Sequence, residues 1–253
     1  MSTKVRVMPT LLFKNVGLVK GIGFDSWRRV GSAMQAVKVY NMREVDELVF
    51  LDITATREGR SPDFDTVDEL ADECFMPLAV GGGVRTVEDV RRLLQVGADK
   101  VVINTAAVEM PELIADVAKR FGSQCVIVSI DARQQAKGTY EACTHSGTVS
   151  TGRDPVSLAR KAEEMGAGEI LITSIERDGT MRGYDLDLTQ RVSEAVSVPV
   201  IASGGAGSYE DMAQALRVGK ASAVAAASIF HFTQQTPLEA KRYLREQGLR
   251  VRL

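Results

Sequence analysis

Short apolar runs rich in β-branched residues recur along the chain and alternate with amphipathic stretches. Near-continuous apolar runs of this kind are typical of parallel strands that are buried on both faces. They predict eight strands, at Val5–Leu12, Glu47–Asp52, Leu78–Val80, Lys100–Asn104, Cys125–Asp131, Glu169–Ser174, Val200–Ala202 and Ala223–Ala226.

The stretches between these runs have helical periodicity. Thr86–Val96 and Pro111–Phe121 are amphipathic, and Asp154–Met165 opens with Asp-Pro, an N-cap followed by proline at the first helical position. Strand and helix alternate about eight times, and no linker or charge block interrupts them. This order predicts an α/β protein, a (β/α)8 TIM barrel that forms a single domain over residues 1–253.

An internal repeat supports the barrel. Met76–Ile103 aligns without gaps on Val198–Ala225, a shift of 122 positions (198 − 76), and the same shift carries Asp46–Asp52 onto Gly168–Ser174. Generic βα units can resemble one another by chance. The shared shift nevertheless favours a barrel built from two half-barrel repeats.

The composition argues against two classes of partner. Of the 253 residues, 45% are hydrophobic and 25% are charged, and the formal net charge is -2. We therefore expect no global attraction to nucleic acid or to acidic membranes. No apolar run approaches the roughly 18 residues of a membrane span, and the run from Val7 to Phe13 is too short for a signal peptide.

The cysteines and histidines offer no metal site. Cys74, Cys125 and Cys143 are odd in number, widely spaced and without a CxxC pair. This usage predicts neither a disulfide framework nor a zinc site and favours a reducing cytoplasm. His145 and His231 lack metal-ligand spacing, so we expect both to be structural or peripheral.

Two glycine turns occupy positions that the repeat relates. Gly82-Gly83 and Gly204-Gly205 each follow a predicted strand and precede a helix with a capping-box pattern. Glycine lets backbone N–H groups approach an anion closely, and the helix end adds positive potential. The turns predict a ligand with two phosphates or two phosphate sites, unless they merely connect elements. Small polar residues that can complete the cradles are Asn104, Thr105 and Ser228.

Three aspartates are candidates for chemistry. Asp131 ends a predicted strand, where a carboxylate points into the active face of a barrel and can act as general acid or base. The alternative for Asp131 is a helix cap or a loop salt bridge. Asp178 has a weaker case, because Asp-Gly is ordinary turn chemistry, and Asp52 is either a site residue or a polar strand end.

Charged residues also stand at or near the beginnings of four predicted strands. Arg6, Glu47, Lys100 and Glu169 would converge at the bottom mouth of a barrel with alternating sign. On spacing alone, solvated strand ends are the preferred interpretation.

Several long segments resemble HisF, the cyclase subunit of imidazole glycerol phosphate synthase. They include DELVFLDITA, VGGGVRTVEDVRRLLQVGADKVVIN, GAGEILITSIERDGT and VPVIASGGAGS, and the resemblance runs from about Arg6 to the C-terminus. It implies a (β/α)8 barrel that receives ammonia from a glutamine amidotransferase (HisH-like glutaminase) docked at its bottom. We expect no cofactor.

The resemblance also implies roles for individual residues. A ring of four charges admits ammonia and is matched by Arg6, Glu47, Lys100 and Glu169. The glutaminase interface is matched by Asp99 and Gln124. The two phosphate sites are matched by Gly82, Asn104 and Thr105 and by Gly179, Gly204 and Ser228. The catalytic aspartate of strand five and the lysine of loop one are matched by Asp131 and Lys20.

One catalytic residue of the family is absent. The family pattern Pro-Cys-Leu-Asp-Val-Lys at the end of strand one reads Pro-Thr-Leu-Leu-Phe-Lys here, so Leu12 stands in the place of an aspartate. Leucine cannot move a proton, and loss of an essential acid–base group commonly costs several orders of magnitude in rate. Lys20 or Asp178 would have to substitute in a working cyclase.

This departure points to a narrower group. The P-x-L-L-x-K pattern and the segment Glu73–Pro77 (ECFMP) resemble HisF-like paralogues linked to acetamidino modification of bacterial surface sugars. Ala79-Val80 and Ile229–Phe232, in contrast, are similar to ordinary HisF. The hypotheses are therefore an amidine-forming synthase, the histidine-pathway cyclase, a silent ammonia-channel or scaffold subunit, and a sugar-phosphate isomerase, which Leu12 also disfavours.

Overall fold

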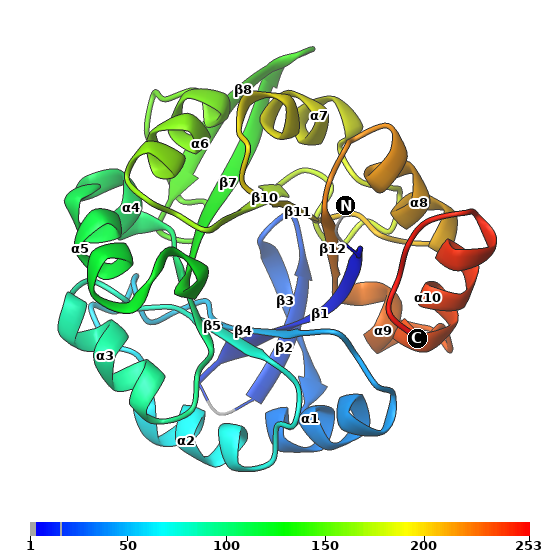
Figure 1. The fold of residues 1–253 in the computed structure, drawn as a ribbon, viewed down its shortest axis with the longest axis horizontal. Coiled ribbons are helices and arrows are strands. Elements are labelled where there is room, and N and C mark those ends of the chain that lie inside the picture. Colours follow the sequence, from blue (N-terminus) through cyan, green and yellow to red (C-terminus); the bar gives the residue numbers. More distant parts are fainter. Residues whose placement is uncertain (1–3, 16) are drawn as a thin grey trace.

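A computed structural model describes residues 4–15 and 17–253. Eight parallel strands form its inner wall, and the barrel closes because β1 pairs with both β4 and β12 (Figure 1). The predicted (β/α)8 fold is confirmed. The barrel strands are β1 (Arg6–Lys14), β4 (Leu48–Asp52), β5 (Leu78–Gly81), β6 (Lys100–Ile103), β7 (Val126–Ala136), β10 (Glu169–Ser174), β11 (Val200–Ser203) and β12 (Ala223–Ala226).

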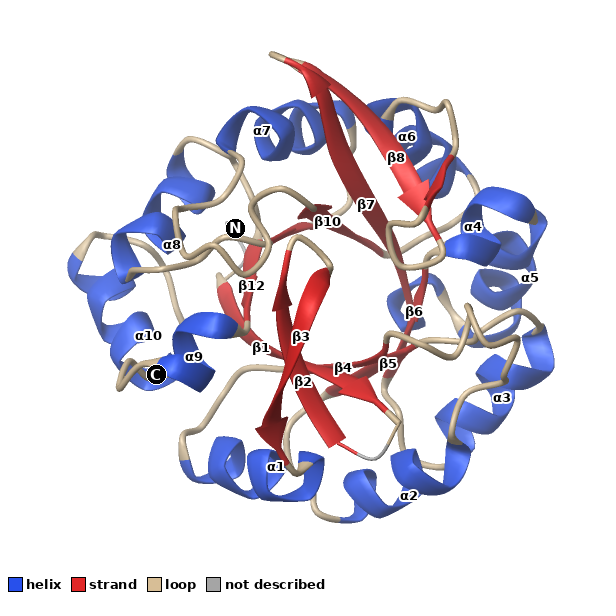
Figure 2. Ribbon diagram, turned by 180° about the vertical axis from the view of Figure 1, so that it is seen from behind, coloured by secondary structure: helices blue, strands red, loops and turns tan. Residues whose placement is uncertain are grey.

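Helices surround the strands on the outside (Figure 2). Where the sequence predicted N-caps they are present: the Asp154 side chain accepts from the Ser157 N–H, and α3 and α8 each begin with a complete capping box. The helices are α1 (Ala33–Met42), α2 (Phe64–Asp72), α3 (Val87–Gln95), α4 (Thr105–Glu109), α5 (Glu112–Phe121), η1 (Ser123–Cys125), α6 (Pro155–Glu164), α7 (Leu186–Ala195), α8 (Tyr209–Arg217), α9 (Ser228–Phe232) and α10 (Pro237–Glu246).

The half-barrel repeat is visible in the element boundaries. β5 and β11 begin at residues 78 and 200, and α3 and α8 begin at residues 87 and 209. Both pairs differ by 122 positions, as the sequence alignment predicted. The two halves therefore share secondary structure as well as sequence.

Two additions to the barrel were not predicted. A hairpin of β2 (Gly17–Ile22) and β3 (Asp25–Gly31) follows β1, and β7 extends beyond the barrel to pair antiparallel with β8 (Thr139–Thr144), which pairs with β9 (Val149–Ser150). β3 and the far end of β7 are largely exposed. They therefore lack the apolar pattern that marks a buried strand.

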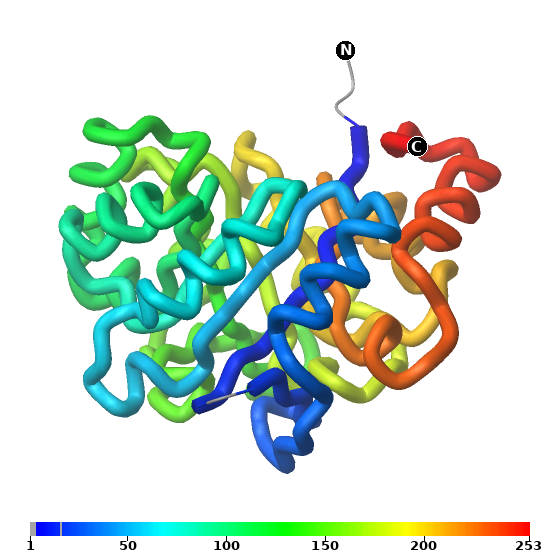
Figure 3. Tube along the Cα trace, turned by 90° about the horizontal axis from the view of Figure 1, so that it is seen from below, coloured from blue at the N-terminus to red at the C-terminus, as the bar shows by residue number. Residues whose placement is uncertain are grey.

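Every second residue of β1 faces the inside of the barrel, so this one strand contributes side chains at both mouths and in the interior. Arg6, Met8 and Leu12 fall on its inner side, at the N-terminal mouth, in the interior and beside the pocket described below. Figure 3 shows the start of β1 and the β2–β3 hairpin at opposite ends of the molecule. The interior between the two mouths is apolar and contains Met8, Val49, Ala79, Val102, Ile127, Leu171, Ile201, Ala223 and Ala225.

None of the helices in the described part of the chain is long and apolar enough to cross a membrane.

Candidate functional site

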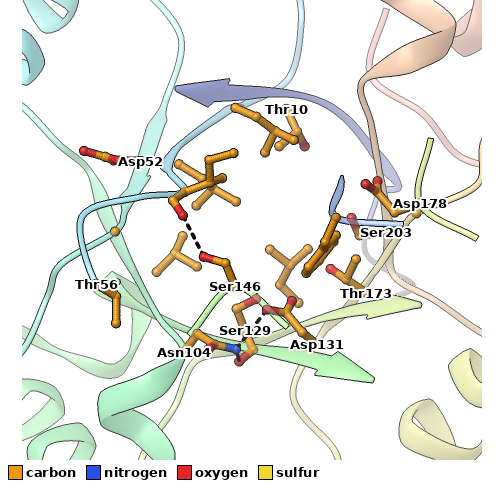
Figure 4. A pocket seen from close by; sticks show the side chains of 18 of the residues that line it. Thr10, Asp52, Thr56, Asn104, Ser129, Asp131, Ser146, Thr173, Asp178 and Ser203 are labelled. Atoms are coloured by element: carbon orange, nitrogen blue, oxygen red, sulfur yellow. Dashed lines mark hydrogen bonds between the residues drawn. The ribbon is translucent and has the colours of Figure 1, made fainter. Parts of the chain in front are cut away.

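A cavity of about 270 Å³ opens at the C-terminal ends of the barrel strands. Its lining comes from all eight barrel strands or from the residues that directly follow them. Asp131 and Asn104 lie on one side of it and Thr10 on the other (Figure 4). This face is where barrel enzymes place their chemistry.

Asp131 is the titratable group best suited to proton transfer. Burial, with a further contribution from the charge of Asp178, raises the pKa of Asp131 from 3.8 to about 7. The Asn104 side-chain amide donates to Asp131 Oδ2 at 3.3 Å and to the Ser129 carbonyl at 3.0 Å. A carboxyl group with a pKa near neutral can both give and accept a proton under working conditions.

Lys20 and Asp178 form a buried ion pair. The Lys20 ammonium, whose side chain is 2% exposed, donates to Asp178 Oδ2 at 2.6 Å. The backbone N–H of Gly23 donates to the Asp178 carbonyl at 2.9 Å. These two bonds tie the β2–β3 hairpin to the loop after β10. The two paired residues are 158 positions apart in the sequence.

The predicted phosphate-binding residues surround the same cavity. Gly82, Gly83, Gly204 and Gly205 all have positive φ, from 74° to 113°, a backbone conformation that favours glycine. A Cβ at Gly82 would collide with the Asp52 carbonyl. The turns therefore require glycine whatever they bind.

Two hydroxyl groups of the cavity have no hydrogen-bond partner among the described residues. Ser228 Oγ, at the start of α9, and Thr10 Oγ1, on β1, are both buried and unpaired. Buried polar atoms are almost always paired in folded proteins. An unpaired hydroxyl that lines a cavity is therefore a natural contact for a ligand.

The first-half cradle is arranged differently. Thr105 Oγ1 accepts from the His145 N–H at 3.0 Å and donates to Asn104 Oδ1 at 3.3 Å. Gly179, assigned to the other phosphate site, lines the cavity with φ 75° beside the backbone of Gly21. All eight expected phosphate-site residues either line the cavity or flank a lining turn. They are Gly82, Gly83, Asn104, Thr105, Gly179, Gly204, Gly205 and Ser228.

The N-terminal mouth carries a closed ring of ion pairs. Arg6 donates to Glu47 at 2.7 Å and to Glu169 at 2.6 Å, and Lys100 donates to Glu47 Oε2 at 3.0 Å and to Glu169 Oε1 at 2.7 Å. Burial opposes the charge of Glu169, but the bonds to Arg6 and Lys100 outweigh burial and lower the pKa of Glu169. The interpretation as separate solvated strand ends is therefore wrong.

Asp99 and Gln124 are exposed on this same face. Asp99, before β6, accepts from the Leu78 N–H at 2.8 Å, and Gln124, before β7, donates to the Phe121 carbonyl at 3.2 Å. Both positions are accessible to a second protein.

A comparison with known families agrees with this arrangement. A model of the histidine biosynthesis protein family matches residues 6–236. The chain belongs to this family. Membership supports a barrel enzyme of the HisA and HisF type, and it confirms the resemblance at that level.

Within this family fold, Leu12 lines the cavity. It lies near the end of β1, between β2 and β4, where its neighbours in register are Val19 and Leu51. No carboxylate takes its place from the flanking strands, because Asp52 is occupied. Asp52 accepts from the N–H groups of Thr54 and Ala55 at 2.9 and 3.0 Å, and from Arg60 at 3.1 Å. Asp52 is thus a loop anchor.

The cavity also includes residues that sequence reasoning missed. Phe24 and Trp27 reach it from the β2–β3 hairpin, and His145 and Ser146 reach it from the turn after β8. His145 and Ser146 have φ of 52° and 56°, and Ser146 Oγ donates to the Ile53 carbonyl at 2.7 Å. The His-Ser-Gly turn was the available signal. His231 does not line the cavity, and burial lowers its pKa.

No group of three or more histidine, cysteine or acidic residues capable of holding a metal ion occurs in residues 4–15 and 17–253.

Proposed function

We propose that this chain is the synthase subunit of a glutamine amidotransferase complex. A HisH-like glutaminase docks at the N-terminal mouth and releases ammonia, which passes the ring of charges and the apolar interior. The ammonia then reacts with a phosphorylated sugar or nucleotide-sugar in the C-terminal cavity. The alignment of ring, interior and cavity on one barrel axis supports this path.

Within this scheme the substrate is held by its phosphates. One cradle consists of the Gly82 turn with Asn104 and Thr105. The other consists of Gly179, the Gly204 turn and the Ser228 hydroxyl, which has no hydrogen-bond partner in the described part of the chain. Backbone N–H groups and hydroxyls are suitable donors to phosphate oxygens.

The observation that favours amidine formation is a cavity lined by Leu12 and by a titratable Asp131. Ammonia can replace the oxygen of an amide carbon once an ATP-dependent pathway enzyme has activated that oxygen as a phosphate ester or an adenylate. The new C–N bond then forms as phosphate or AMP leaves with the oxygen, and one carboxylate can shuttle the proton that the nitrogen loses to the leaving oxygen. Asp131, with a pKa of about 7, suits that shuttle. The chemistry needs no carboxylate at position 12.

The histidine-pathway cyclase is the second candidate, and the family match favours it. That reaction would need a substitute for the aspartate missing at Leu12. Lys20 and Asp178 are already paired at 2.6 Å, so neither is available as an independent general base. A silent ammonia-channel or scaffold subunit is disfavoured because it would not require a carboxyl with a raised pKa at Asp131 in the cavity lining.

The deciding assay supplies the purified protein with the histidine-pathway bisphosphate substrate and saturating ammonium salt. We expect little or no imidazole glycerol phosphate. Turnover of order 1 per second, an ordinary enzyme rate, would return the protein to the histidine pathway. Leu12→Asp should restore some product, because the cradles for that bisphosphate are intact.

A second assay tests the positive half of the proposal. An acetamido nucleotide-sugar, isotopically labelled ammonium and the protein are incubated with its pathway enzymes and ATP, and nitrogen incorporation is followed by mass spectrometry. Label in the sugar that depends on Asp131 supports the amidine-forming reaction. Label that also appears with Asp131→Asn would assign the chemistry to another protein and leave this chain as a channel.

A further inference from the structure

Two large apolar side chains stand out on the N-terminal face. Phe75 is 85% exposed and Met42 is 77% exposed, more than any other exposed large apolar residue of the described chain. Met42 ends α1, which leads into β4, and Phe75 lies between α2 and β5. Both connections enter their strands at the mouth that carries the charge ring.

A hydrogen-bonded loop holds the two residues in place. The Asn41 side chain, next to Met42, donates to the Glu73 carbonyl at 2.5 Å and accepts from the Phe75 N–H at 3.1 Å. Lys38 also pairs with Glu73 at 3.3 Å. The Phe75 ring is therefore displayed by a fixed backbone, which lowers the entropy cost of binding a partner.

The other half-barrel provides an internal comparison. The repeat relates Met42 to Glu164 and Phe75 to Ser197, and these counterparts are polar and exposed. Met42 and Glu164 are the last residues of α1 and α6, and Phe75 and Ser197 lie three residues before β5 and β11. The same scaffold thus accepts polar residues at both positions. Exposed apolar side chains here are not a requirement of the fold.

Charged residues of both signs surround the pair, since Arg43 directly follows Met42 and Lys38 pairs with Glu73. Glu44 lies two residues after Met42, Asp72 three residues before Phe75, and both are exposed. Asp99 is also exposed and binds the N–H of Leu78, the first residue of β5. An aromatic anchor with a charged margin is the usual anatomy of a protein interface.

We propose that Phe75 and Met42 form the apolar anchor on which the ammonia-supplying glutaminase docks. The partner surface that fits is an apolar pocket bordered by charged residues. This inference rests on the proposed function and adds that docking is off-centre, on the first half-barrel. The anchor is continuous with the ring because Glu47, a ring member, directly precedes β4.

The test uses Phe75→Ser, which installs the residue of the second half, and Met42→Glu, which does the same for Met42. The matched control is Val149→Ser, an apolar residue that is 46% exposed on β9, away from the N-terminal face. Binding of a purified HisH-like glutaminase from the same genome is measured by calorimetry. Turnover is measured with glutamine and with ammonium salt.

We expect Phe75→Ser to raise Kd at least about tenfold and Met42→Glu to raise it less. Glutamine-dependent turnover should fall at low partner concentration and recover at saturation, while ammonium-dependent turnover and Tm stay unchanged. Val149→Ser should bind like the wild type.

Other results overturn the inference. If the wild type binds the glutaminase and Phe75→Ser binds equally well, the anchor is wrong and the proposed function stands. If the wild type binds no glutaminase, both the anchor and the proposed function are wrong. If the chain alone sediments as a dimer that Phe75→Ser dissociates, the surface joins two copies of this chain instead.

Discussion

Both mouths of the barrel contain polar side chains that are shielded from solvent. Those at the N-terminal mouth form ion pairs with one another, whereas two at the C-terminal mouth lack a partner in the part of the chain that the structure describes. At the N-terminal mouth, each of the four ring charges is bonded to two partners of opposite sign. At the C-terminal mouth, Asp131 has a pKa raised to about 7 and is only partly ionised near neutral pH, and the hydroxyls of Thr10 and Ser228 have no hydrogen-bond partner among the described residues. Satisfied groups can stabilise a closed arrangement, whereas unsatisfied groups cost free energy until a ligand completes them.

This difference between the two mouths indicates that the chemistry takes place at the C-terminal one. The charges of the ring are engaged with one another in ion pairs, whereas Asp131 faces a cavity. The C-terminal mouth is less stable than it could be, and this is a common property of active sites. The experiments below test each mouth.

The largest effect should come from Asp131→Asn. Asparagine keeps the shape but cannot transfer the proton, and general acid–base groups contribute about 100-fold or more to rate. We therefore expect kcat with saturating ammonium to fall by at least about 100-fold, with phosphate-ligand affinity nearly unchanged. Loss of affinity with kcat preserved would make Asp131 a binding residue.

The same variant should also change how the free energy of unfolding depends on pH. Burial raises the pKa of Asp131 from 3.8 to about 7, so between these values the folded protein holds a proton that the unfolded chain has lost. The free energy of unfolding therefore falls as pH rises through this window. One pKa unit is about 1.4 kcal/mol, so a shift from 3.8 to about 7 gives a total of about 4 kcal/mol.

Asp131→Asn removes this dependence. Relative to the wild type, its free energy of unfolding should be higher at about pH 8 than at about pH 4 by an amount of that order. Urea titrations at the two pH values measure it. An equal difference at both would show that Asp131 has an ordinary pKa in the folded protein.

Comparing the mouths also shows what could be predicted from the sequence. The glycine turns were found because the 122-residue repeat places them, whereas the ring residues were noticed at strand ends but were implied to form a ring only by the family resemblance. Capped helices such as α6 were found because their signals are local. The Lys20–Asp178 pair was not, since it joins residues 158 positions apart. Nor were Phe24 and Trp27, whose hairpin is too exposed to show a strand pattern.

A smaller effect is expected at the closed mouth. Lys100→Glu places a third carboxylate against Glu47 and Glu169, which now form ion pairs with Lys100 at 2.8 and 2.7 Å. Glutamine-dependent turnover should fall roughly 10- to 100-fold more than ammonium-dependent turnover, because only the coupled route crosses the ring. Equal losses would make the ring purely structural.

Lys220→Glu is the matched control for this variant. It makes the same charge change between α8 and β12, on the same face, where Lys220 is exposed and pairs with Glu194 outside the ring. The ratio of the two turnover rates should stay that of the wild type. Thermal melts of both variants show how far ring disruption reduces stability.

The smallest effect should separate the two phosphate cradles. Ser228 Oγ is buried and has no partner among residues 4–15 and 17–253, so Ser228→Ala removes no hydrogen bond between these residues. The affinity for a phosphorylated ligand should fall about five- to tenfold, since one net hydrogen bond is worth about 1 kcal/mol. The Tm should stay unchanged. Thr105→Val instead leaves the His145 N–H without its acceptor at 3.0 Å, so it should lower both affinity and Tm. Titration calorimetry with a sugar bisphosphate and thermal melts distinguish the two variants. A Ser228→Ala protein that binds normally would mean that its hydroxyl does not contact the phosphate.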